Sequence, residues 1–457
     1  MRAGRVLVRR LGRLALARAR GREVSEDALA RAVSLVFQDL GTTFVKFGQL
    51  VASSPGIFGE RFSEEFRSCL DTGPAVPFET VRATVESTLG RSIAETFASF
   101  DPEPIGRASV AVVHRAVLHD GRVVAVKVLR PRVEAAIAVD LRVMQPLFRF
   151  LAGRVGIPAA GQMVRLLDGF GEQVAEELDL RNEARAMAHF RRLQAIVADL
   201  GSIVVPEPLP ALSGQRVLTM DFLDGVPIDD LERVAALGVD PRPAVQQMVR
   251  GWFAIALRDG VFHGDVHAGN VLVLRDGRVG VLDWGIVGRL DPRAHNFLRR
   301  TIAAALGDDA AWADVAREMV AAYGPALETG LGLDEAGLAE FIREVMHPML
   351  TRPFGEVSLG TFLTAITGQV SAVRNGSGRT GWRDRLRAMR QQREMHSGIM
   401  KQGAIGTSFD RGTFLLAKQL LYFERYGKMF LPDVSILSDR AFFDSAMRAG
   451  PIAGSAA

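Results

Sequence analysis

The sequence has a single cysteine, Cys69, among 457 residues. One cysteine excludes an internal disulfide framework and is typical of a reducing compartment, where we expect it to be a small buried hydrophobic residue. No apolar run reaches the length of about 18 residues that spans a bilayer. The longest candidate, residues 357–373, is diluted by Ser, Thr, Gln and Gly. We therefore expect no transmembrane helix and a cytoplasmic protein.

Acidic residues are absent from the first 22 positions, which hold eight arginines. The net charge of the whole chain is only +4, so the rest is net negative, and binding to nucleic acid is not expected. Segment 1–22 has no signal-peptide core. Three interpretations remain open: a helix lying peripherally on the anionic inner face of a membrane, a basic helix that is solvated or packed internally, and a mitochondrial-type presequence.

Two apolar runs flank a short polar loop within residues 261–273, where Asp265 lies five residues before Asn270. A further apolar run ends at Asp283, 18 residues after Asp265. Asp, Asn and Asp in this order suit phosphoryl transfer. One carboxylate then accepts the proton of the attacking hydroxyl, while the amide and the second carboxylate hold Mg²⁺ on the phosphates.

Two other interpretations of this loop must be weighed. The His-x-Asp sequence is short enough to arise by chance. His263, Asp265 and His267 also offer ligands for a metal of the kind that hydrolases use. The metal interpretation leaves Asn270 and Asp283 without a role, and the combined pattern is more specific than its parts.

A lysine inside an apolar strand is the second candidate. Residues 109–130 are predicted to form a β-hairpin, with Ala125 and Lys127 in its second strand. Because burying an unpaired ammonium is costly, Lys127 is expected either to be paired at a cleft or to reach solvent from a sheet edge. The preceding turn contains small residues whose backbone amides can approach phosphate. The candidates in this turn are Gly106, Ala108, Ser109 and Val110.

Two predicted helices carry further polar candidates. The first, over residues 25–52, has Lys46 and Gln49 on one side, which taken alone indicates a solvated face. Residues 133–200 are predicted to be helical. Asp179 and Glu183, four residues apart, would then stack like charges on one face, as a partner for Lys127 or as a solvated acidic face.

The remaining chain is predicted to be mostly helical. Strands are expected at 204–206 and 216–220, followed by a hinge at 221–225, where backbone groups of Met220 and Phe222 would meet an adenine edge. An apolar helix at 243–258 precedes the polar loop. The later predicted helices are 292–306, 310–323, 334–350, 380–397 and 412–427.

The order of these elements is similar to that of the protein-kinase-like fold, and the details resemble the UbiB family of atypical kinases (the AarF/ADCK group). Residues 44–49 resemble the KxGQ signature of that family, and residues 177–184 resemble its ExD segment. Residues 263–270 and 283–285 resemble its catalytic and metal-binding loops. The resemblance is strong over residues 25–300.

This resemblance implies an α+β, bilobal protein-kinase-like fold with a small β-containing N-lobe, a large helical C-lobe and a helical N-terminal extension carrying KxGQ. The expected parts are a basic amphipathic segment 1–24, the extension 25–90, the N-lobe 91–220, the C-lobe 221–445 and a flexible tail 446–457.

The resemblance also implies ATP and Mg²⁺ as cofactors. Lys127 would hold the phosphates and pair with Glu183 or Glu177. Asn270 and Asp283 would bind Mg²⁺, and Asp265 would act on the acceptor. The remaining expected site residues are Lys46 and Gln49, which would gate the site, and their partners Glu177 and Asp179.

Members of the family are linked to isoprenoid-quinone biosynthesis, so an isoprenoid or other lipid, or a small molecule, is the expected acceptor. This chain departs from the family pattern in its loop 106–114, which lacks consecutive alanines, and in having Ala268 and Trp284 where Pro and Phe are usual. Two alternatives stay open: a small-molecule phosphotransferase of the antibiotic-kinase type, and a nucleotide-switched membrane scaffold with little turnover.

Overall fold

The protein is described from a computed structural model. It describes residues 6, 9–10, 12, 26–40, 42–52, 64–66, 75–154, 171, 174–194, 200–323, 333–357 and 411–449. The predictions for Cys69, for the helix at 380–397 and for most of segment 1–22 lie outside these residues.

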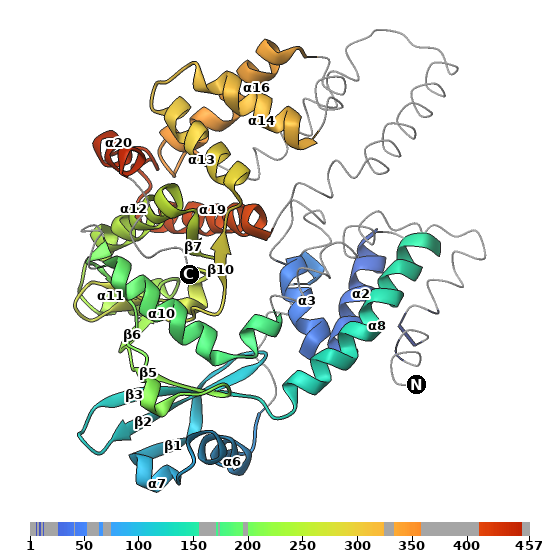
Figure 1. Ribbon diagram of the computed structural model, residues 1–457, viewed down its shortest axis with the longest axis vertical. Coiled ribbons are helices and arrows are strands. Elements are labelled where there is room, and N and C mark those ends of the chain that lie inside the picture. Colours follow the sequence, from blue (N-terminus) through green and yellow to red (C-terminus); the bar gives the residue numbers. More distant parts are fainter. Residues whose placement is uncertain are drawn as a thin grey trace. The chain divides into compact units, whose positions relative to one another are not determined.

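The chain divides into two compact units, whose helices and strands are labelled in Figure 1. The first contains Met1–Ala188 and Pro206–Leu223, and the second contains His189–Val205 and Asp224–Ala457. Helix α10 (Leu180–Gln194) begins in the first unit and ends in the second. The chain returns to the first unit at Pro206 and leaves it again after Leu223.

The first unit combines a four-stranded antiparallel sheet, in the order β1-β2-β3-β5, with helices. The strands are β1 (Phe97–Arg107), β2 (Ala111–Leu118), β3 (Val123–Leu129) and β5 (Val217–Asp221). The helices are α2 (Glu26–Leu40), α3 (Thr42–Ala52), α6 (Phe78–Leu89), α7 (Ile93–Thr96), α8 (Val133–Arg154), the 3₁₀ turn η3 (Pro210–Leu212) and the start of α10.

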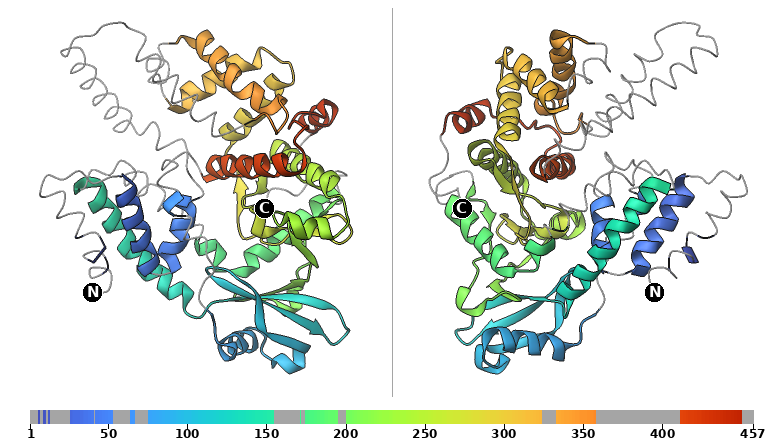
Figure 2. Two further views of the ribbon diagram at one scale, coloured as in Figure 1. Left: turned by 180° about the vertical axis from the view of Figure 1, so that it is seen from behind. Right: turned by 45° about the vertical axis from the view of Figure 1, so that its right-hand side comes forward.

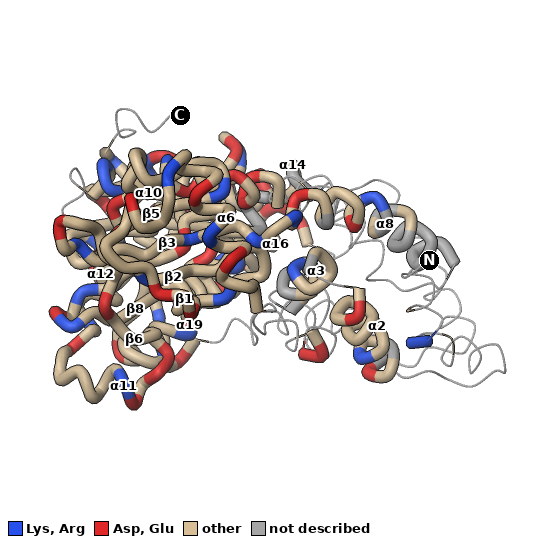
Figure 3. Tube along the Cα trace, turned by 90° about the horizontal axis from the view of Figure 1, so that it is seen from below, with Lys and Arg blue, Asp and Glu red and all other residues tan. Residues whose placement is uncertain are grey.

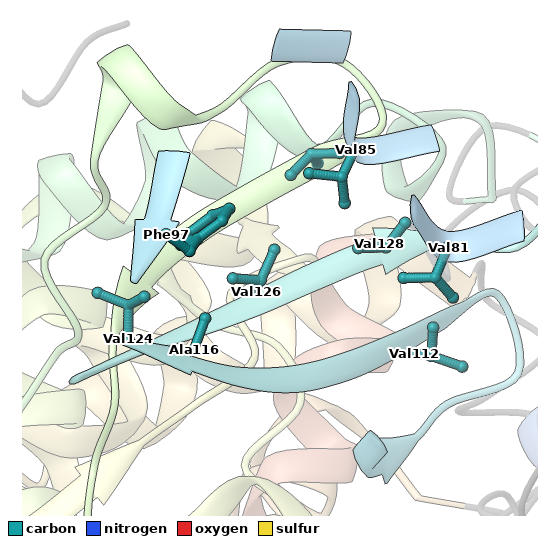
Figure 4. Close-up of a cluster of buried hydrophobic side chains, with 9 residues drawn as sticks. Val81, Val85, Phe97, Val112, Ala116, Val124, Val126 and Val128 are labelled. Carbon is teal, nitrogen blue, oxygen red and sulfur yellow. The ribbon is translucent and has the colours of Figure 1, made fainter. Parts of the chain in front are cut away.

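One face of this sheet is an apolar core (Figure 4). Val124, Val126 and Val128 alternate along β3 and pack with Val81 and Val85 of α6. Successive residues of a strand point to opposite faces. Ala125 and Lys127 therefore lie on the face away from this core.

The N-terminal helices pack through phenylalanines. Phe37 of α2 contacts Phe44 of α3 and also Phe66, with ring centroids 5.7 and 5.0 Å apart. The single helix predicted over 25–52 is wrong, because α2 ends at Leu40 and a separate helix α3 begins at Thr42. Figure 2 shows α2, α3 and α8 from two further directions.

The second unit is mainly helical and contains two small sheets, ordered β4-β9-β8-β6 and β10-β7. Its strands are β4 (Ile203–Val204), β6 (Gly225–Pro227), β7 (Val261–His263), β8 (Val271–Leu274), β9 (Val279–Val281) and β10 (Val287–Arg289). Its helices are the end of α10, α11 (Leu231–Ala236), α12 (Arg242–Asp259), the 3₁₀ turn η4 (Ala268–Asn270), α13 (Pro292–Ala305), α14 (Ala311–Tyr323), α16 (Glu335–Thr351), α19 (Arg411–Phe430) and α20 (Arg440–Arg448).

Helix α12 is the centre of the second unit, and most of its length between Ala244 and Leu257 is buried. The periodicity of the sequence predicted α12, α13, α14, α16 and α19 correctly, whereas α20 was not expected. Helix α19 approaches β10 so closely that a Cβ atom at Gly412 would collide with the carbonyl oxygen of Arg289. Only glycine permits this contact.

Charge is mixed along both units: acidic and basic residues both occur along the described traces in Figure 3, for example on α8 and α11. Within the described residues, no helix combines the length and the apolar character that crossing a membrane requires.

Candidate active site

In the first unit, Lys127 lies on the sheet face opposite the apolar core. The strand register places Gly106, Val113 and Lys127 in one cross-strand row, and it places Met220 opposite Ala125. Residues that face each other across antiparallel strands project to the same side. Four predicted nucleotide-binding positions, Gly106, Ala125, Lys127 and Met220, therefore share one face of the sheet.

Lys127 is paired with Glu183 in the first turn of α10. Its Nζ atom lies 2.9 and 2.8 Å from the two carboxylate oxygens, and the two side chains are only 9% and 4% exposed. The sequence left the choice between Glu183 and Glu177 open, and the structure selects Glu183. The alternative of a lysine that reaches solvent from a sheet edge is wrong, because β3 is an inner strand and Lys127 is buried.

Glu177 instead forms a largely buried ion pair with Lys46 of α3. Asp179 does not join this pair: it accepts two side-chain hydrogen bonds from Arg181, at 2.8 and 2.6 Å. These bonds from the Arg181 guanidinium lower the pKa of Asp179. The interpretation of a solvated face for Lys46 is thus wrong, and so is the prediction of Asp179 as its partner. Gln49 lies in α3.

Asp179 and Glu183 do not stack on one helical face as predicted. Asp179 lies in a non-helical position before Leu180, where α10 begins. The helical structure predicted for 133–200 is interrupted there, because the Asp179 carboxylate accepts the Arg181 backbone amide at 3.1 Å in a local turn.

The turn before the hairpin is shorter than predicted. Gly106 lies within β1, and only Ala108, Ser109 and Val110 form the connection to β2. The amide of Ala108 donates to the carbonyl of Ala111 at 2.9 Å, so the expectation that this amide meets phosphate is wrong. Burial and the nearby charge of Arg107 lower the pKa of Arg130, whose Nε donates to the Ala108 carbonyl.

At the predicted hinge, strand β5 continues to Asp221. The amide of Asp221 donates to the carbonyl of Glu207 at 3.1 Å, and that of Phe222 to the carbonyl of Val123 at 3.4 Å. The expectation of an open backbone amide is therefore wrong for Phe222, whereas contact of Met220 and Phe222 with a nucleotide stays a prediction. The guanidinium of Arg115 lies 5.8 Å from the centre of the Phe222 ring.

In the second unit, strand pairing brings Asn270 and Asp283 together. Strands β8 and β9 are antiparallel with Val271 opposite Val281, and the amide of Leu282 donates to the carbonyl of Asn270 at 2.9 Å. Asp283 is the next residue, so both side chains leave the same end of this hairpin. The Asn270 side-chain nitrogen donates to the Asp265 backbone carbonyl at 3.2 Å. Asp265 therefore lies beside Asn270 and Asp283.

His263 connects the two carboxylate-bearing segments. Its Nδ1 accepts the Asp265 amide at 3.0 Å, and its Nε2 donates to the Asp283 carbonyl at 2.6 Å. Burial lowers the pKa of His263 to about 4, so the ring is neutral at pH 7. Both ring nitrogens are engaged by backbone, which excludes His263 as a metal ligand. Among the described residues, no three His, Cys, Asp or Glu side chains gather as a metal site.

Asp265 forms an ion pair that the sequence did not reveal. Lys418 of α19 lies 2.6 Å from Asp265 Oδ1, and Nε2 of His267 lies 4.0 Å from Oδ2. Burial opposes ionisation of Asp265, but the positive charge of Lys418 and the proximity of His267 outweigh it, so the pKa of Asp265 is lowered. Asp265 is thus held as a carboxylate at neutral pH.

Two further side chains of α19 hold the backbone of this loop. The Gln419 amide accepts the Val266 N–H at 3.0 Å and donates to the Gly264 carbonyl at 2.6 Å. The Tyr426 hydroxyl donates to the Val266 carbonyl at 2.6 Å. Gln419 and Tyr426 are both fully buried. A glutamine surrounded by leucines in 414–421 was a signal in the sequence, since a buried amide requires hydrogen-bond partners.

A small apolar cavity of about 40 Å³ lies beside His263 and Trp284. Its other walls are mainly aliphatic and aromatic residues such as Phe190, Met248 and Trp252. Pockets for cofactors typically measure about 300–1,000 Å³. This cavity is too small for a nucleotide.

Comparison with known proteins places the chain in a family. A family model described as the ABC1 atypical kinase-like domain matches residues 68–315. An uncharacterised chloroplastic aarF domain-containing protein kinase from Arabidopsis thaliana is 32% identical over 89% of this chain and 72% of its own length. An uncharacterised protein from Mycobacterium tuberculosis is 35% identical over 88% of this chain and 75% of its own. A probable protein kinase UbiB from Marinobacter nauticus is 29% identical over 91% and 69%, respectively.

A solved structure of the Mycobacterium tuberculosis protein Rv3197 with erythromycin is 22% identical, with a TM-score of 0.45, and covers 72% of this chain and 86% of that one. The family match and the two units define an α+β, bilobal protein-kinase-like fold, as predicted. The chain belongs to the ABC1 atypical kinase-like family, which includes the aarF and UbiB proteins, and the predicted family is confirmed.

Proposed function

We propose that this protein is an ATP- and Mg²⁺-dependent atypical kinase or ATPase. The observation that carries the proposal is the linked arrangement of Asp265, Asn270 and Asp283 at the end of the β8–β9 hairpin. Phosphoryl transfer uses one carboxylate as the base and an amide together with a second carboxylate as ligands of Mg²⁺. These three side chains are the groups that such a site requires.

The donor set fits Mg²⁺, which takes one or two protein oxygens together with phosphates and water. Asp283 would offer a carboxylate oxygen. The nitrogen of the Asn270 amide donates to Asp265, so its oxygen is the atom that it offers to a cation. Bound Mg²⁺ would neutralise phosphate charge, and Asp265 would orient or deprotonate the acceptor hydroxyl.

Lys127 would hold the phosphates, and its buried contact with Glu183 supports this role. A bidentate carboxylate fixes the ammonium on one face of the sheet. Gly106, Ala125 and Met220 share this face and would contact the nucleotide, together with Ser109, Val110 and Phe222 from the adjoining segments. Lys46 and Gln49 of α3 would gate access, with Glu177 holding Lys46.

Calorimetric titration with ATP, in the presence and absence of Mg²⁺, tests the proposal. The wild type should bind more tightly with Mg²⁺, and Asp283→Asn should remove most of this gain. Asp276→Asn is the matched control, because Asp276 lies in the β8–β9 turn and bonds to Arg278. Asp276→Asn should bind as the wild type does. Equal Mg²⁺ dependence in all three proteins would count against the metal site.

The acceptor belongs to the same proposal: an isoprenoid or another lipid, or a small molecule, at a membrane surface reached through the basic residues 1–22. Liposomes with anionic headgroups should bind the full chain and raise its ATP hydrolysis, which a passive scaffold would not show. Deleting residues 1–22 should abolish liposome binding. Retention of binding by the shortened chain would place the membrane contact elsewhere.

A further inference from the structure

The ion pair between Lys418 and Asp265 joins the proposed catalytic loop to a helix 153 residues later in the chain. The two side chains are 11% and 19% exposed, so the contact is mostly shielded from water. Lys418 Nζ also lies 5.8 Å from the centre of the Tyr422 ring, one helical turn further along α19. The ammonium is therefore held between a carboxylate and an aromatic face.

Two other side chains of α19 also hold the backbone of this loop. Gln419 bonds to the backbone of Gly264 and Val266, the residues on either side of Asp265, and Tyr426 bonds to the Val266 carbonyl. Buried ion pairs contribute little net stability, because desolvation of the two charges offsets their attraction. Burying Lys418 costs desolvation energy that the ion pair does not return as stability. This indicates that Lys418 takes part in the reaction.

The segment between Asp265 and Asn270 reads Val-His-Ala-Gly and contains no lysine or arginine. In phosphoryl transfer, negative charge spreads over the oxygens of the transferring group, and a preorganised cation stabilises it strongly. A lysine has a flexible stem and a compact ammonium that can turn from a carboxylate to a phosphoryl oxygen nearby.

We propose that Lys418 is a catalytic cation of this site that contacts the transferring phosphoryl group of a bound nucleoside triphosphate. This inference rests on the proposed function. The acceptor oxygen forms a bond to the γ-phosphorus, and the bond from phosphorus to the β–γ bridging oxygen breaks, with its electron pair leaving on the nucleoside diphosphate. The acceptor proton passes to Asp265, and Lys418 stays protonated throughout.

The experiment compares the affinity of the full-length protein for Mg²⁺·ADP with that for Mg²⁺·ADP·aluminium fluoride, which mimics the transferring group. The variants are Lys418→Met, Lys418→Arg and the control Lys428→Met, an exposed lysine on the same helix that pairs with Glu424. Lys418→Met should lose roughly 100-fold in affinity for the mimic, in the range reported for single transition-state donors. Its affinity for Mg²⁺·ADP should change less than about threefold, within the effect expected of an interaction confined to the transition state.

Lys418→Arg should recover part of the loss, and Lys428→Met should match the wild type. The inference is overturned if Lys418→Met binds both ligands as the wild type does, and in that case the proposed function stands. It is also overturned if Lys418→Met loses both ligands equally together with thermal stability, since that result shows a structural role. A wild type that binds neither ligand would refute the proposed function itself, and the inference with it.

Discussion

The Nε2 atom of His263 donates to the carbonyl oxygen of Asp283 at 2.6 Å, while Nδ1 of the same ring accepts the amide of Asp265. One buried, neutral imidazole thus connects the backbones that carry the two proposed functional carboxylates. Protonation would place a donor where the Asp265 amide also donates, so this arrangement requires the neutral ring.

This requirement predicts a pH dependence of stability. Histidine in an unfolded chain has a pKa of about 6.5, and the folded value for His263 is about 4. Between these values the unfolded chain binds more protons, so stability is lost as the pH falls through this window. The difference corresponds to about 3 kcal/mol. The free energy of unfolding of the wild type should fall more steeply from pH 7 to pH 4 than that of His263→Asn. Parallel urea-denaturation curves for both proteins at each pH would refute this assignment.

From the Lys127–Glu183 pair we predict that one substitution lowers the stability of the protein more than the double substitution does. Lys127→Met removes the ammonium from the buried Glu183 carboxylate, which costs about 3–5 kcal/mol. Adding Glu183→Met should recover most of that loss, because an apolar pair of similar volume is tolerated. The measurement is the urea midpoint of each variant. As a control, Arg242→Met removes an exposed pair with Asp240 and should cost less than about 1 kcal/mol.

The Lys46–Glu177 pair predicts energetic coupling that excludes Asp179. A double-mutant cycle with Lys46→Met and Glu177→Gln should show a coupling energy of about 1–3 kcal/mol in thermal or urea unfolding. The same cycle with Asp179→Asn should show coupling below about 0.5 kcal/mol, because Asp179 pairs with Arg181. Equal coupling in the two cycles would mean that Lys46 is shared between both acids.

We predict that substitutions in α19 make the loop around Asp265 more mobile, although they lie far from this loop in the sequence. Gln419→Ala leaves the Val266 N–H and the Gly264 carbonyl without partners, at a cost of about 1–3 kcal/mol for each buried group. Tyr426→Phe removes one hydrogen bond and should cost about 1 kcal/mol. Hydrogen–deuterium exchange of the segment 261–273 should accelerate in both variants, and more in Gln419→Ala. Unchanged exchange in Gln419→Ala would show that α19 does not stabilise this loop.

The sequence predicted those parts of the site that depend on local patterns. The alternation of apolar residues located the strand with Lys127, and the apolar runs around Asp265, Asn270 and Asp283 located the segments that the structure pairs as β8 and β9. The pairing of β8 with β9 was not predicted, although their short connection is typical of a hairpin.

Ion pairs whose partners depend on where a helix starts were harder to predict from the sequence. Glu177, Asp179 and Glu183 lie within seven residues, and each has a different basic partner. The choice among them follows from the start of α10 at Leu180 and from the local turn of Asp179 with Arg181. Helix boundaries are the least certain part of a prediction from sequence.

The contribution of α19 could not be predicted, because Lys418 looks like any lysine on an amphipathic helix and its partner lies 153 residues away. Only the tertiary fold brings the two together. The sequence held one indication that was not used: Gln419 lies among leucines, and a buried amide requires hydrogen-bond partners.

The position of α19 also has a consequence for biosynthesis. A ribosome that has translated the chain through Gly285 has already supplied His263, Asp265, Asn270 and Asp283. Lys418, Gln419 and Tyr426 emerge only after more than a hundred further residues have been added. The nascent loop therefore lacks the contacts of α19 until that helix has been translated. A premature stop codon before α19 would yield a product that keeps the signature motifs but lacks the helix that bonds to the loop around Asp265.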